Sequence, residues 1–285
     1  MNIAFLGTGI MGAPMAANLI AKGFAVAVYN RNAARLGPLV EKGARACATI
    51  AEAVAGADVV ITMLGLPGDV EAVYLGDDGV IVHARAGAAL IDMTTSSPAL
   101  ARRIAEAATV RGLVALDAPV SGGEIGAINA KLSIMVGGDR DAFERMRPVF
   151  EAMGTNINHL GPAGAGQHCK LVNQTVIAGT MLGVAEGVAY AMKSGLDPAQ
   201  VLAAIGTGAA GSFLLNGLGP KMVSGDFAPG FMIEHIAKDL RLASDEAAGM
   251  GLDLEGLSVA LRRYASLREA GRAREGTQAL IRSYV

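Results

Sequence analysis

Phe5-Leu-Gly-Thr-Gly-Ile-Met-Gly-Ala-Pro-Met15 decides the fold, because this stretch joins an apolar run to a helical pattern through closely spaced glycines. The run Asn2 to Leu6 predicts a short buried strand, and residues 10–22 have the apolar spacing of a helix. A strand, a glycine turn and a helix in this order are typical of the first unit of a doubly wound α/β fold. The sequence therefore predicts a Rossmann-type domain from its first residues.

The three glycines of the turn have the spacing G-x-G-x-x-G. Gly7 permits the tight turn, Gly9 lets backbone N–H groups approach a pyrophosphate, and Gly12 allows close packing of helix on strand. The N-terminus of the helix adds partial positive charge that faces the phosphates. We expect a dinucleotide to contact this turn, including Ile10 and Met11 between the last two glycines. The alternative is a glycine turn with a structural role alone.

The end of the second predicted strand, residues 24–29, bears on the choice of nucleotide. NAD-selective sites usually place Asp or Glu there to accept from the adenosine ribose hydroxyls. This chain has Asn30 instead, followed by Arg31 and Arg35, which could bind a 2′-phosphate through charge-assisted hydrogen bonds. We therefore expect NADP(H) to be preferred over NAD(H), unless both arginines are simply solvated surface residues.

Composition limits the class of protein. A chain of 285 residues with 52% hydrophobic content suits two well-packed α/β and helical domains. The net charge of −2 and the lack of a basic run argue against a nucleic-acid partner. Two cysteines, Cys47 and Cys169, are too few for a disulfide framework and favour a reducing cytoplasm. We expect no signal peptide, because the first strand begins at once.

One segment imitates a membrane span. Residues 171–192 are apolar apart from Asn173, Gln174 and Glu186, and are long enough to cross a bilayer. Nothing else in the sequence is typical of a membrane protein. A buried helix without membrane contact is therefore the favoured interpretation.

The chain is expected to divide near residue 163 into a Rossmann domain, 1–163, and an all-α domain, 164–285. Strand and helix patterns alternate before this point, which predicts a mostly parallel sheet covered on both faces. Further predicted strands are residues 58–64, 88–93, 114–118 and 132–136. After it we expect a long helix at about 164–194 and then helices at 198–205, 213–223, 233–249 and 254–270.

Gly179, Gly183 and Gly187 recur every four residues along the long predicted helix. Glycine lowers helix propensity, so this spacing predicts that another backbone packs closely against that face. We therefore expect a homodimer or homotetramer formed through the helical domain.

Ligands of doubly wound sheets bind beyond the carboxyl ends of the strands. Those ends are expected at Leu64 to Pro67, Asp92 to Thr95 and Asp117 to Gly123, with Leu64 contacting the cofactor. In the last segment the Ser121 hydroxyl lies beside the N–H groups of Gly122 and Gly123, which could bind a substrate carboxylate. An ordinary glycine-rich loop is the alternative.

Lys170 lies two turns into an otherwise apolar helix, and Asn173 follows three residues later on the same face. Such a lysine either extends to solvent or faces a functional cavity, where it could exchange a proton near neutral pH. Cys169 points away from Lys170 and is interpreted as a core residue. His168 has no metal-ligand spacing around it, so no metal site is predicted.

These segments together resemble the β-hydroxyacid dehydrogenase family, which includes 3-hydroxyisobutyrate dehydrogenase, tartronate semialdehyde reductase and glyoxylate/succinic semialdehyde reductases. The resemblance covers nearly the whole chain. The matching motifs are Gly7-Thr-Gly-Ile-Met-Gly-Ala-Pro-Met-Ala-Ala-Asn-Leu19, Asp117-Ala-Pro-Val-Ser-Gly-Gly123, Met135-Val-Gly-Gly138 and Gly164-Ala-Gly-Gln-His-Cys-Lys-Leu-Val-Asn173.

The resemblance implies roles for individual residues. It makes Lys170 the catalytic acid/base and Ser121, Gly122, Gly123 and Asn173 substrate ligands. It also places Thr95 near the nicotinamide. The helical domain is implied to complete the site through substrate contacts from Phe231 and Asp239 and a cofactor contact from Lys238.

The reaction implied by the resemblance is reduction of a short semialdehyde acid (tartronate semialdehyde, succinic semialdehyde or glyoxylate) by NADPH. Two positions depart from the common family pattern: Gln174, where many members have Asn, and Ala130, where glycine is common. The alternatives are an NAD-dependent 3-hydroxyisobutyrate dehydrogenase, an imine reductase, and a non-catalytic NADPH-binding module. The lysine at position 170 disfavours the last two.

Overall fold

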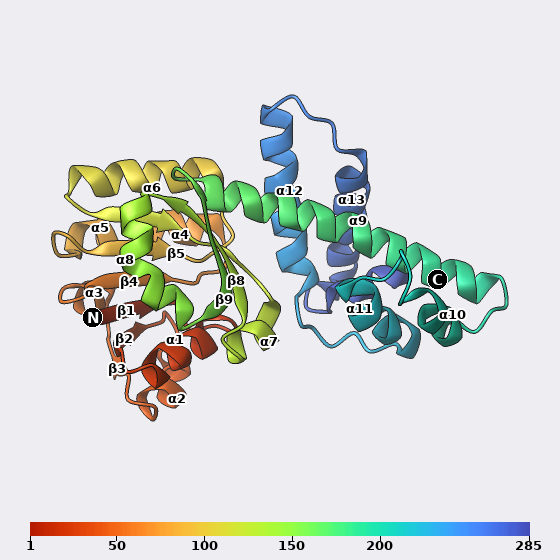
Figure 1. The fold of residues 1–285 in the computed structure, drawn as a ribbon, viewed down its shortest axis with the longest axis horizontal. Helices are drawn as coiled ribbons and strands as arrows, with labels where there is room; N and C mark the ends of the chain where they lie inside the picture. The colour runs from red at the N-terminus through yellow and green to blue at the C-terminus, as the bar shows by residue number, and fades with distance from the viewer. The chain divides into compact units, whose positions relative to one another are not determined.

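The computed structural model describes residues 1–285 in two units, residues 1–170 and 171–285, with the division inside one long helix (Figure 1). The first unit contains a nine-stranded sheet in the order β3-β2-β1-β4-β5-β6-β8-β7, with β9 paired to β8. The strands are β1 (Asn2–Leu6), β2 (Ala25–Tyr29), β3 (Arg45–Ala46), β4 (Val59–Thr62), β5 (Ala89–Asp92), β6 (Val114–Asp117), β7 (Val120–Ser121), β8 (Leu132–Gly138) and β9 (Gly154–Gly161).

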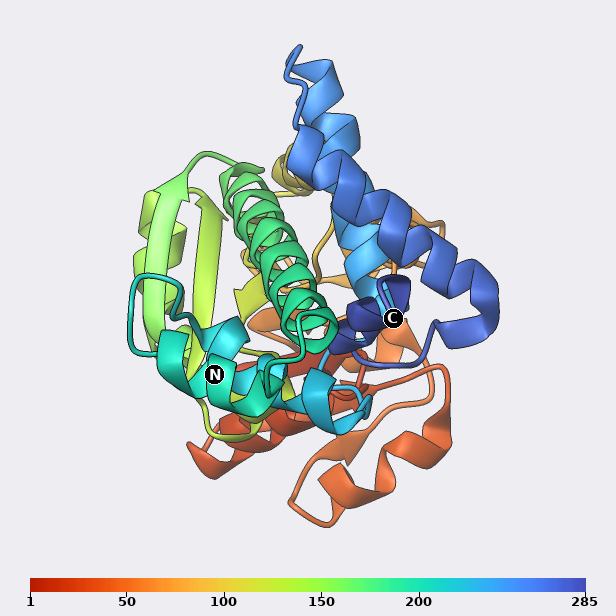
Figure 2. The ribbon, with the colours of Figure 1, turned by 90° about the vertical axis from the view of Figure 1, so that its right-hand side faces the viewer.

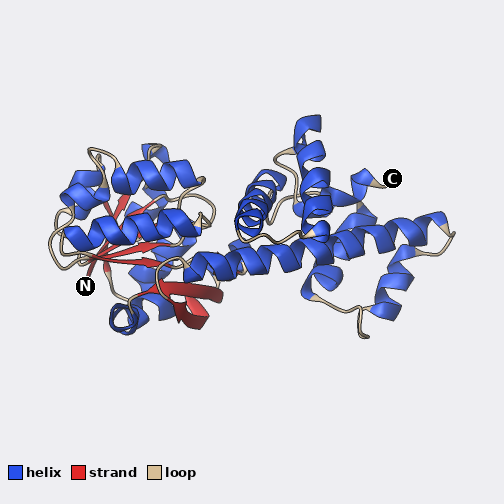
Figure 3. Ribbon diagram, turned by 90° about the horizontal axis from the view of Figure 1, so that it is seen from above, coloured by secondary structure: helices blue, strands red, loops and turns tan.

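Helices cover both faces of this sheet, as Figure 3 shows. Ile3 and Phe5 of β1 pack into one apolar core and Ala4 and Leu6 into another, because successive side chains of a strand point to opposite faces. Strands buried on both faces read as continuous apolar runs, which is why β1 was predictable. The helices are α1 (Gly12–Ala21), α2 (Gly37–Val40), α3 (Ile50–Val54), α4 (Pro67–Leu75), α5 (Val80–His83), α6 (Pro98–Val110), α7 (Gly123–Ile128) and α8 (Arg140–Glu151).

The sheet is mixed, and three of its strands were not predicted. β8 runs antiparallel to both β6 and β7, while β9 is parallel to β8. β9 has the sequence GTNINHLG, is exposed or half-buried after its first residue, and lacks the apolar run that marks a buried strand. β3 and β7 contain two residues each, which is too short for any periodicity to register.

The second unit is helical throughout, in agreement with the sequence prediction. α12 and α13 lie side by side, as Figure 2 shows. Predicted and observed helix ends agree within a few residues, and α10 and α12 have the predicted bounds. The helices are α9 (Ala165–Lys193), α10 (Pro198–Ile205), α11 (Phe213–Ser224), α12 (Ile233–Gly249) and α13 (Glu255–Leu267), followed by a π turn (Arg268–Arg272) and a 3₁₀ turn (Thr277–Ser283).

The glycine face of α9 is not covered by any other part of this chain, and its predicted packing against a second copy stays a prediction. A Cβ added at Gly179, Gly183 or Gly187 would meet no atom within 4 Å, so no backbone of this chain packs there. The opposite face supplies Ala178, Met181 and other side chains to the core of the second unit. α9 is the one helix long and apolar enough to cross a membrane, and 44% of its most apolar window is buried within the protein.

Candidate active site

The glycine turn after β1 has the geometry that a dinucleotide requires. Gly7 has φ +97°, and a Cβ on Gly12 would clash with the Gly7 carbonyl oxygen. Around Gly9 the space is open, with only the Arg35 guanidinium 3.9 Å from the position of an added Cβ. α1 begins without a side-chain cap at Met11 and without an acidic residue in its first turn. Its first N–H groups and dipole therefore suit a pyrophosphate, so the residues present fit an NAD(P) cofactor.

The side chains after β2 lie close to this turn. Asn30 Nδ2 donates to Thr8 Oγ1 at 2.9 Å, which fixes the end of β2 against the glycine turn. Arg31 is 80% exposed and pairs with Asp69 across 3.1 Å. No carboxylate follows β2 directly, and the Arg35 guanidinium is the cation nearest to Gly9 among these side chains.

The carboxyl ends of β4 and β5 are joined by hydrogen bonds. The Leu64 N–H donates to Thr94 Oγ1 at 2.9 Å, so the loops that follow the two strands are held together. Thr95 comes next and is partly buried. Ile10, predicted to contact the cofactor, is 52% exposed at the glycine turn.

Asp117, at the end of β6, anchors the start of α9. Its Oδ1 accepts from the Gly164 N–H at 2.7 Å, and its Oδ2 accepts from the Gln167 N–H at 2.8 Å. Asp117 is 4% exposed, and burial raises the pKa of its carboxyl group despite these hydrogen bonds. A Cβ on Gly166 would lie 2.6 Å from the Asp117 carbonyl oxygen, so the helix lies directly against the strand end.

Gln167 joins the same turn of α9 to the end of β5. Its Nε2 donates to the Thr94 carbonyl oxygen at 2.8 Å, and its Oε1 accepts from the Ser96 N–H at 2.9 Å. Gln167 is fully buried, and Lys170 follows one helical turn later with 6% exposure. The buried lysine is thus on a helix whose first turn is bonded to two strand ends.

The loop after β6 contains the predicted carboxylate ligands. Ser121 ends β7 and is partly buried, opposite Ser133 in the antiparallel pair. Gly122 has φ +130° and Gly123 has φ +61°, backbone conformations that residues with a side chain rarely adopt. α7 then begins without a side-chain cap.

A hydrogen-bonded chain in the second unit links several predicted residues. Asn173 Nδ2 donates to Gln174 Oε1 at 2.8 Å, and Gln174 Nε2 donates to Asp239 Oδ2 at 2.6 Å. Asp239 Oδ1 pairs with Lys238 Nζ across 3.0 Å. Asp239 is 1% exposed, and its carboxylate connects Gln174 to Lys238 within this network. Gln174, noted only as a departure from the family pattern, connects Asn173 to Asp239.

The remaining residues considered from the sequence are Phe231, Cys169 and His168, and the substrate contact of Phe231 stays a prediction. Phe231 precedes α12 and packs on the core of the second unit, with its ring 5.8 Å from that of His235. Cys169 is partly exposed and not, as interpreted from the sequence, a core residue. Partial burial still raises the pKa of its thiol, which is consistent with an unreactive cysteine. No group of three or more His, Cys, Asp or Glu side chains is arranged to hold a metal ion, including around His168.

Sequence reasoning assigned no function to Asp117, Gln167 and Gln174. Asp117 and Gln167 belong to two of the family motifs, but the groups with which they form hydrogen bonds are far away in the sequence. The available signal for Gln167 was a polar side chain at the start of a mostly apolar predicted helix, three residues before Lys170. Such a side chain needs hydrogen-bond partners if it is buried.

Asp92, at the end of β5, is a buried carboxyl group beside the same strand ends. Its Oδ1 accepts from Thr62 Oγ1 at 2.8 Å and from the Thr94 N–H at 3.1 Å. Burial outweighs these hydrogen bonds and raises the pKa of Asp92 to about 6. Burial also raises the pKa of Tyr74, whose hydroxyl lies 2.9 Å from Thr62 Oγ1.

We expect Asp92→Asn to gain stability relative to the native chain as the pH rises from about 4 to about 7. The pKa of an unfolded aspartate is about 3.9, so between that value and about 6 the folded state holds more protons and native stability falls with pH. The relative gain should be on the order of 3 kcal/mol. Urea unfolding of both proteins across this range measures it. A difference in unfolding free energy that stays constant with pH would contradict the prediction.

Two protein-family models match this chain, one over each of its two parts. Residues 2–161 match the family model of the NAD binding domain of 6-phosphogluconate dehydrogenase. Residues 164–284 match the model described as NAD-binding of NADP-dependent 3-hydroxyisobutyrate dehydrogenase. The two models together cover nearly the whole chain.

Individual relatives are similar over their full length. An uncharacterized oxidoreductase of Bacillus subtilis (strain 168), YkwC, is 50% identical, with 100% of this chain and 99% of the relative covered. The NAD-dependent L-serine dehydrogenase of Pseudomonas aeruginosa is 43% identical, with 95% and 94% covered. The solved structure of Mycobacterium tuberculosis 3-hydroxyisobutyrate dehydrogenase with L-serine is 37% identical, with a TM-score of 0.91 and 99% and 98% covered.

Proposed function

The chain belongs to the 3-hydroxyisobutyrate dehydrogenase family of NAD(P)-dependent β-hydroxyacid dehydrogenases, and we propose that it reduces a short semialdehyde acid with NADPH. Tartronate semialdehyde, succinic semialdehyde and glyoxylate are the proposed substrates. The observation that carries the proposal is the buried Lys170, on a helix bonded at its first turn to the ends of β5 and β6.

The side chains around the glycine turn support NADPH as the coenzyme. Asn30 replaces the carboxylate that would repel a 2′-phosphate, and it is already engaged with Thr8. The Arg35 guanidinium lies beside Gly9, and Arg31 follows Asn30 on the surface. Arg31 pairs with Asp69, so Arg35 is the cation on which the preference for a phosphorylated ribose mainly rests.

In the proposed reaction the bound nicotinamide supplies hydride to the carbonyl carbon. Lys170, as an ammonium, gives its proton to the carbonyl oxygen as negative charge develops there, and becomes the neutral amine. Ser121 and the N–H groups of Gly122 and Gly123 bind the substrate carboxylate and so orient the carbonyl group. Asn173, Phe231, Asp239 and Lys238 keep the roles that the family resemblance implies, as predictions.

Absorbance at 340 nm tests the proposal directly. Oxidation of NADPH and of NADH is followed with each proposed substrate and with methylmalonate semialdehyde. Reduction of NADP⁺ and of NAD⁺ is followed with L-serine and 3-hydroxyisobutyrate. Turnover of a semialdehyde with NADPH at a higher kcat/KM than with NADH is the expected result. No turnover of any semialdehyde with either coenzyme would contradict the proposal.

A second candidate is NAD-linked oxidation of a small β-hydroxy acid. It is favoured by the similarity to the NAD-dependent L-serine dehydrogenase, which is 43% identical. The same assay separates the candidates, because this one requires NAD⁺ to give the higher kcat/KM with L-serine or 3-hydroxyisobutyrate.

Arg35→Ala should discriminate between the coenzymes. If the guanidinium binds the 2′-phosphate, its loss should raise KM for NADPH by about tenfold or more and leave KM for NADH unchanged. Arg45→Ala is the control, since Arg45 is a surface arginine paired with Glu52. An equal rise in both coenzyme constants would show that Arg35 does not read the 2′-phosphate.

We also propose that the glycine face of α9 binds a second copy of the chain. Val172, Val176 and Tyr190 are 65%, 64% and 75% exposed along α9, an unusual density of exposed apolar side chains. Gly183→Arg should therefore reduce the mass measured by light scattering to that of one chain, 28.9 kDa. Lys193→Ala is the control at the end of the same helix. A native protein that is already monomeric would refute the proposal.

A further inference from the structure

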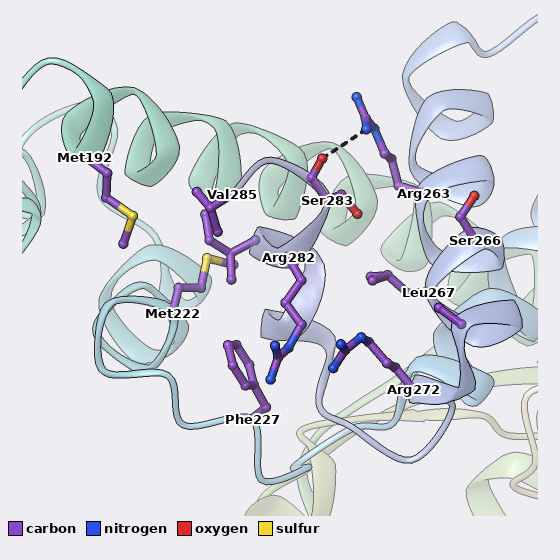
Figure 4. A pocket seen from close by; sticks show the side chains of 12 residues that line it. Met192, Met222, Phe227, Arg263, Ser266, Leu267, Arg272, Arg282, Ser283 and Val285 are labelled. Carbon is purple, nitrogen blue, oxygen red and sulfur yellow. Dashed lines mark hydrogen bonds between the residues drawn. The ribbon is translucent and has the colours of Figure 1, made fainter.

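The second unit contains a cavity of about 520 Å³ that shares no lining residue with the candidate active site. The end of α9, α11, α13 and the last 3₁₀ turn supply its walls (Figure 4). Cavities of about 300–1,000 Å³ are typical of small-molecule sites. The cavity is therefore large enough for a small organic ligand.

One part of the cavity wall is apolar. Met192, Met222, Phe227 and Leu267 contribute it. Figure 4 shows Met192, Met222 and Phe227 on the same side, next to α11. Methionine side chains are flexible and polarizable, so this wall could adapt to ligands of different shape.

The neighbouring part of the wall is cationic. Arg272 and Arg282 share one carboxylate: Glu275 Oε1 lies 2.9 Å from Arg272 Nη1, and Glu275 Oε2 lies 3.2 Å from Arg282 Nε. The Arg282 guanidinium also stacks on the Phe227 ring, with 4.1 Å between the guanidinium carbon and the ring centroid. Arg263 adds a third cation and donates to the Ser283 carbonyl oxygen at 3.2 Å.

The two guanidinium groups are fixed in place while much of their binding capacity is unused. An arginine has five N–H donors, and the ion pairs with Glu275 engage one nitrogen of each side chain. Figure 4 shows the Arg272 and Arg282 guanidinium groups close together beside Phe227. One carboxylate leaves this pair with a net positive charge, and a planar guanidinium suits a carboxylate or phosphate head group.

We propose that this cavity binds an organic anion with an apolar body, its head group bound by Arg272 and Arg282 and its body against Met222 and Phe227. A carboxylate and a phosphate ester offer the same acceptor chemistry to these arginines. The ligand class is thus an anionic amphiphile, and the site is separate from the one at which we place catalysis.

Calorimetric titration of the full-length protein with decanoate tests the proposal, beside decyl phosphate, decanol and acetate. Decanoate should bind at one site per chain, and decanol and acetate at least tenfold more weakly, because each lacks half of the ligand. The tighter of decanoate and decyl phosphate identifies the preferred head group. Decanol binding as tightly as both anions would overturn the proposal.

Substitutions locate the binding site. Arg272→Ala and Arg282→Ala should each weaken decanoate binding at least tenfold, and each leaves Glu275 with one arginine partner. Arg274→Ala, which removes an exposed charge from the same segment, and Ser121→Ala at the candidate active site should leave binding unchanged. Equal affinity in all four variants would show that decanoate binds elsewhere. Ser266→Phe, at an exposed position on the cavity wall, should block binding without disturbing the core.

Discussion

Lys170→Ala is expected to lower kcat at least about a hundredfold, since general acid–base transfer contributes about 10²–10⁴-fold. The side chain is 6% exposed and belongs to a helix whose start is bonded to two strand ends, so its position is well defined. NADPH binding should change little, because the glycine turn and Arg35 supply the contacts proposed for the coenzyme. Steady-state kinetics and fluorescence titration of NADPH measure the two effects separately.

Two further variants identify the role of the lysine. Lys170→Arg keeps the charge but should remain inactive, because a guanidinium does not release its proton near neutral pH. Lys193→Ala, at the exposed end of the same helix, should retain native kcat. Native-like turnover in Lys170→Ala would remove the lysine from the mechanism and leave the family assignment unaffected.

Asp117→Ala is expected to lower the free energy of unfolding by about 2–6 kcal/mol. The change leaves two buried N–H groups, those of Gly164 and Gln167, without their acceptor, at a cost of about 1–3 kcal/mol each. Because the same turn positions Lys170, kcat should also fall by about tenfold or more at temperatures where the variant is folded. Urea unfolding and steady-state kinetics measure the two quantities.

Asp139→Ala provides a matched comparison for Asp117. Asp139 also accepts from a helix N-terminus, the Ala142 N–H at 2.8 Å, but it is exposed to solvent. Water can replace this acceptor, so the loss should be about 1 kcal/mol with no change in kcat. Equal losses for the two variants would mean that the burial of Asp117 adds nothing to the anchoring of α9.

Local patterns were sufficient for much of the fold. The β1 run, the glycine turn and the apolar spacing of α10 and α12 are recorded within a few neighbouring residues, so their bounds could be predicted from sequence. The short strands β3 and β7 could not, because pairing with longer strands stabilises them and leaves no periodic signal. β9 could not either, because it is held in the sheet by pairing with β8 and has no apolar run of its own.

The glycines of α9 show the limit of local patterns. Positions 166 and 179 of α9 both hold glycine, but their surroundings differ. A Cβ on Gly166 would press on the end of β6, whereas a Cβ on Gly179 would meet nothing within 4 Å. The regular spacing suggested close packing at Gly179, and within this chain the close packing is at Gly166. Whether a glycine is required depends on which element packs against it, and the sequence of the helix alone does not contain that information.

The sequence by itself determined the doubly wound class, the nucleotide-binding turn, the long helix and the candidate lysine, because each depends on residue types at short separations. Only the tertiary structure decided how that lysine is held. Asp117 meets Gly164 across 47 residues, Gln167 meets Thr94 across 73, and Gln174 meets Asp239 across 65. Such hydrogen bonds depend on how strands and helices are brought together in space, and on the burial that makes each unpaired group costly.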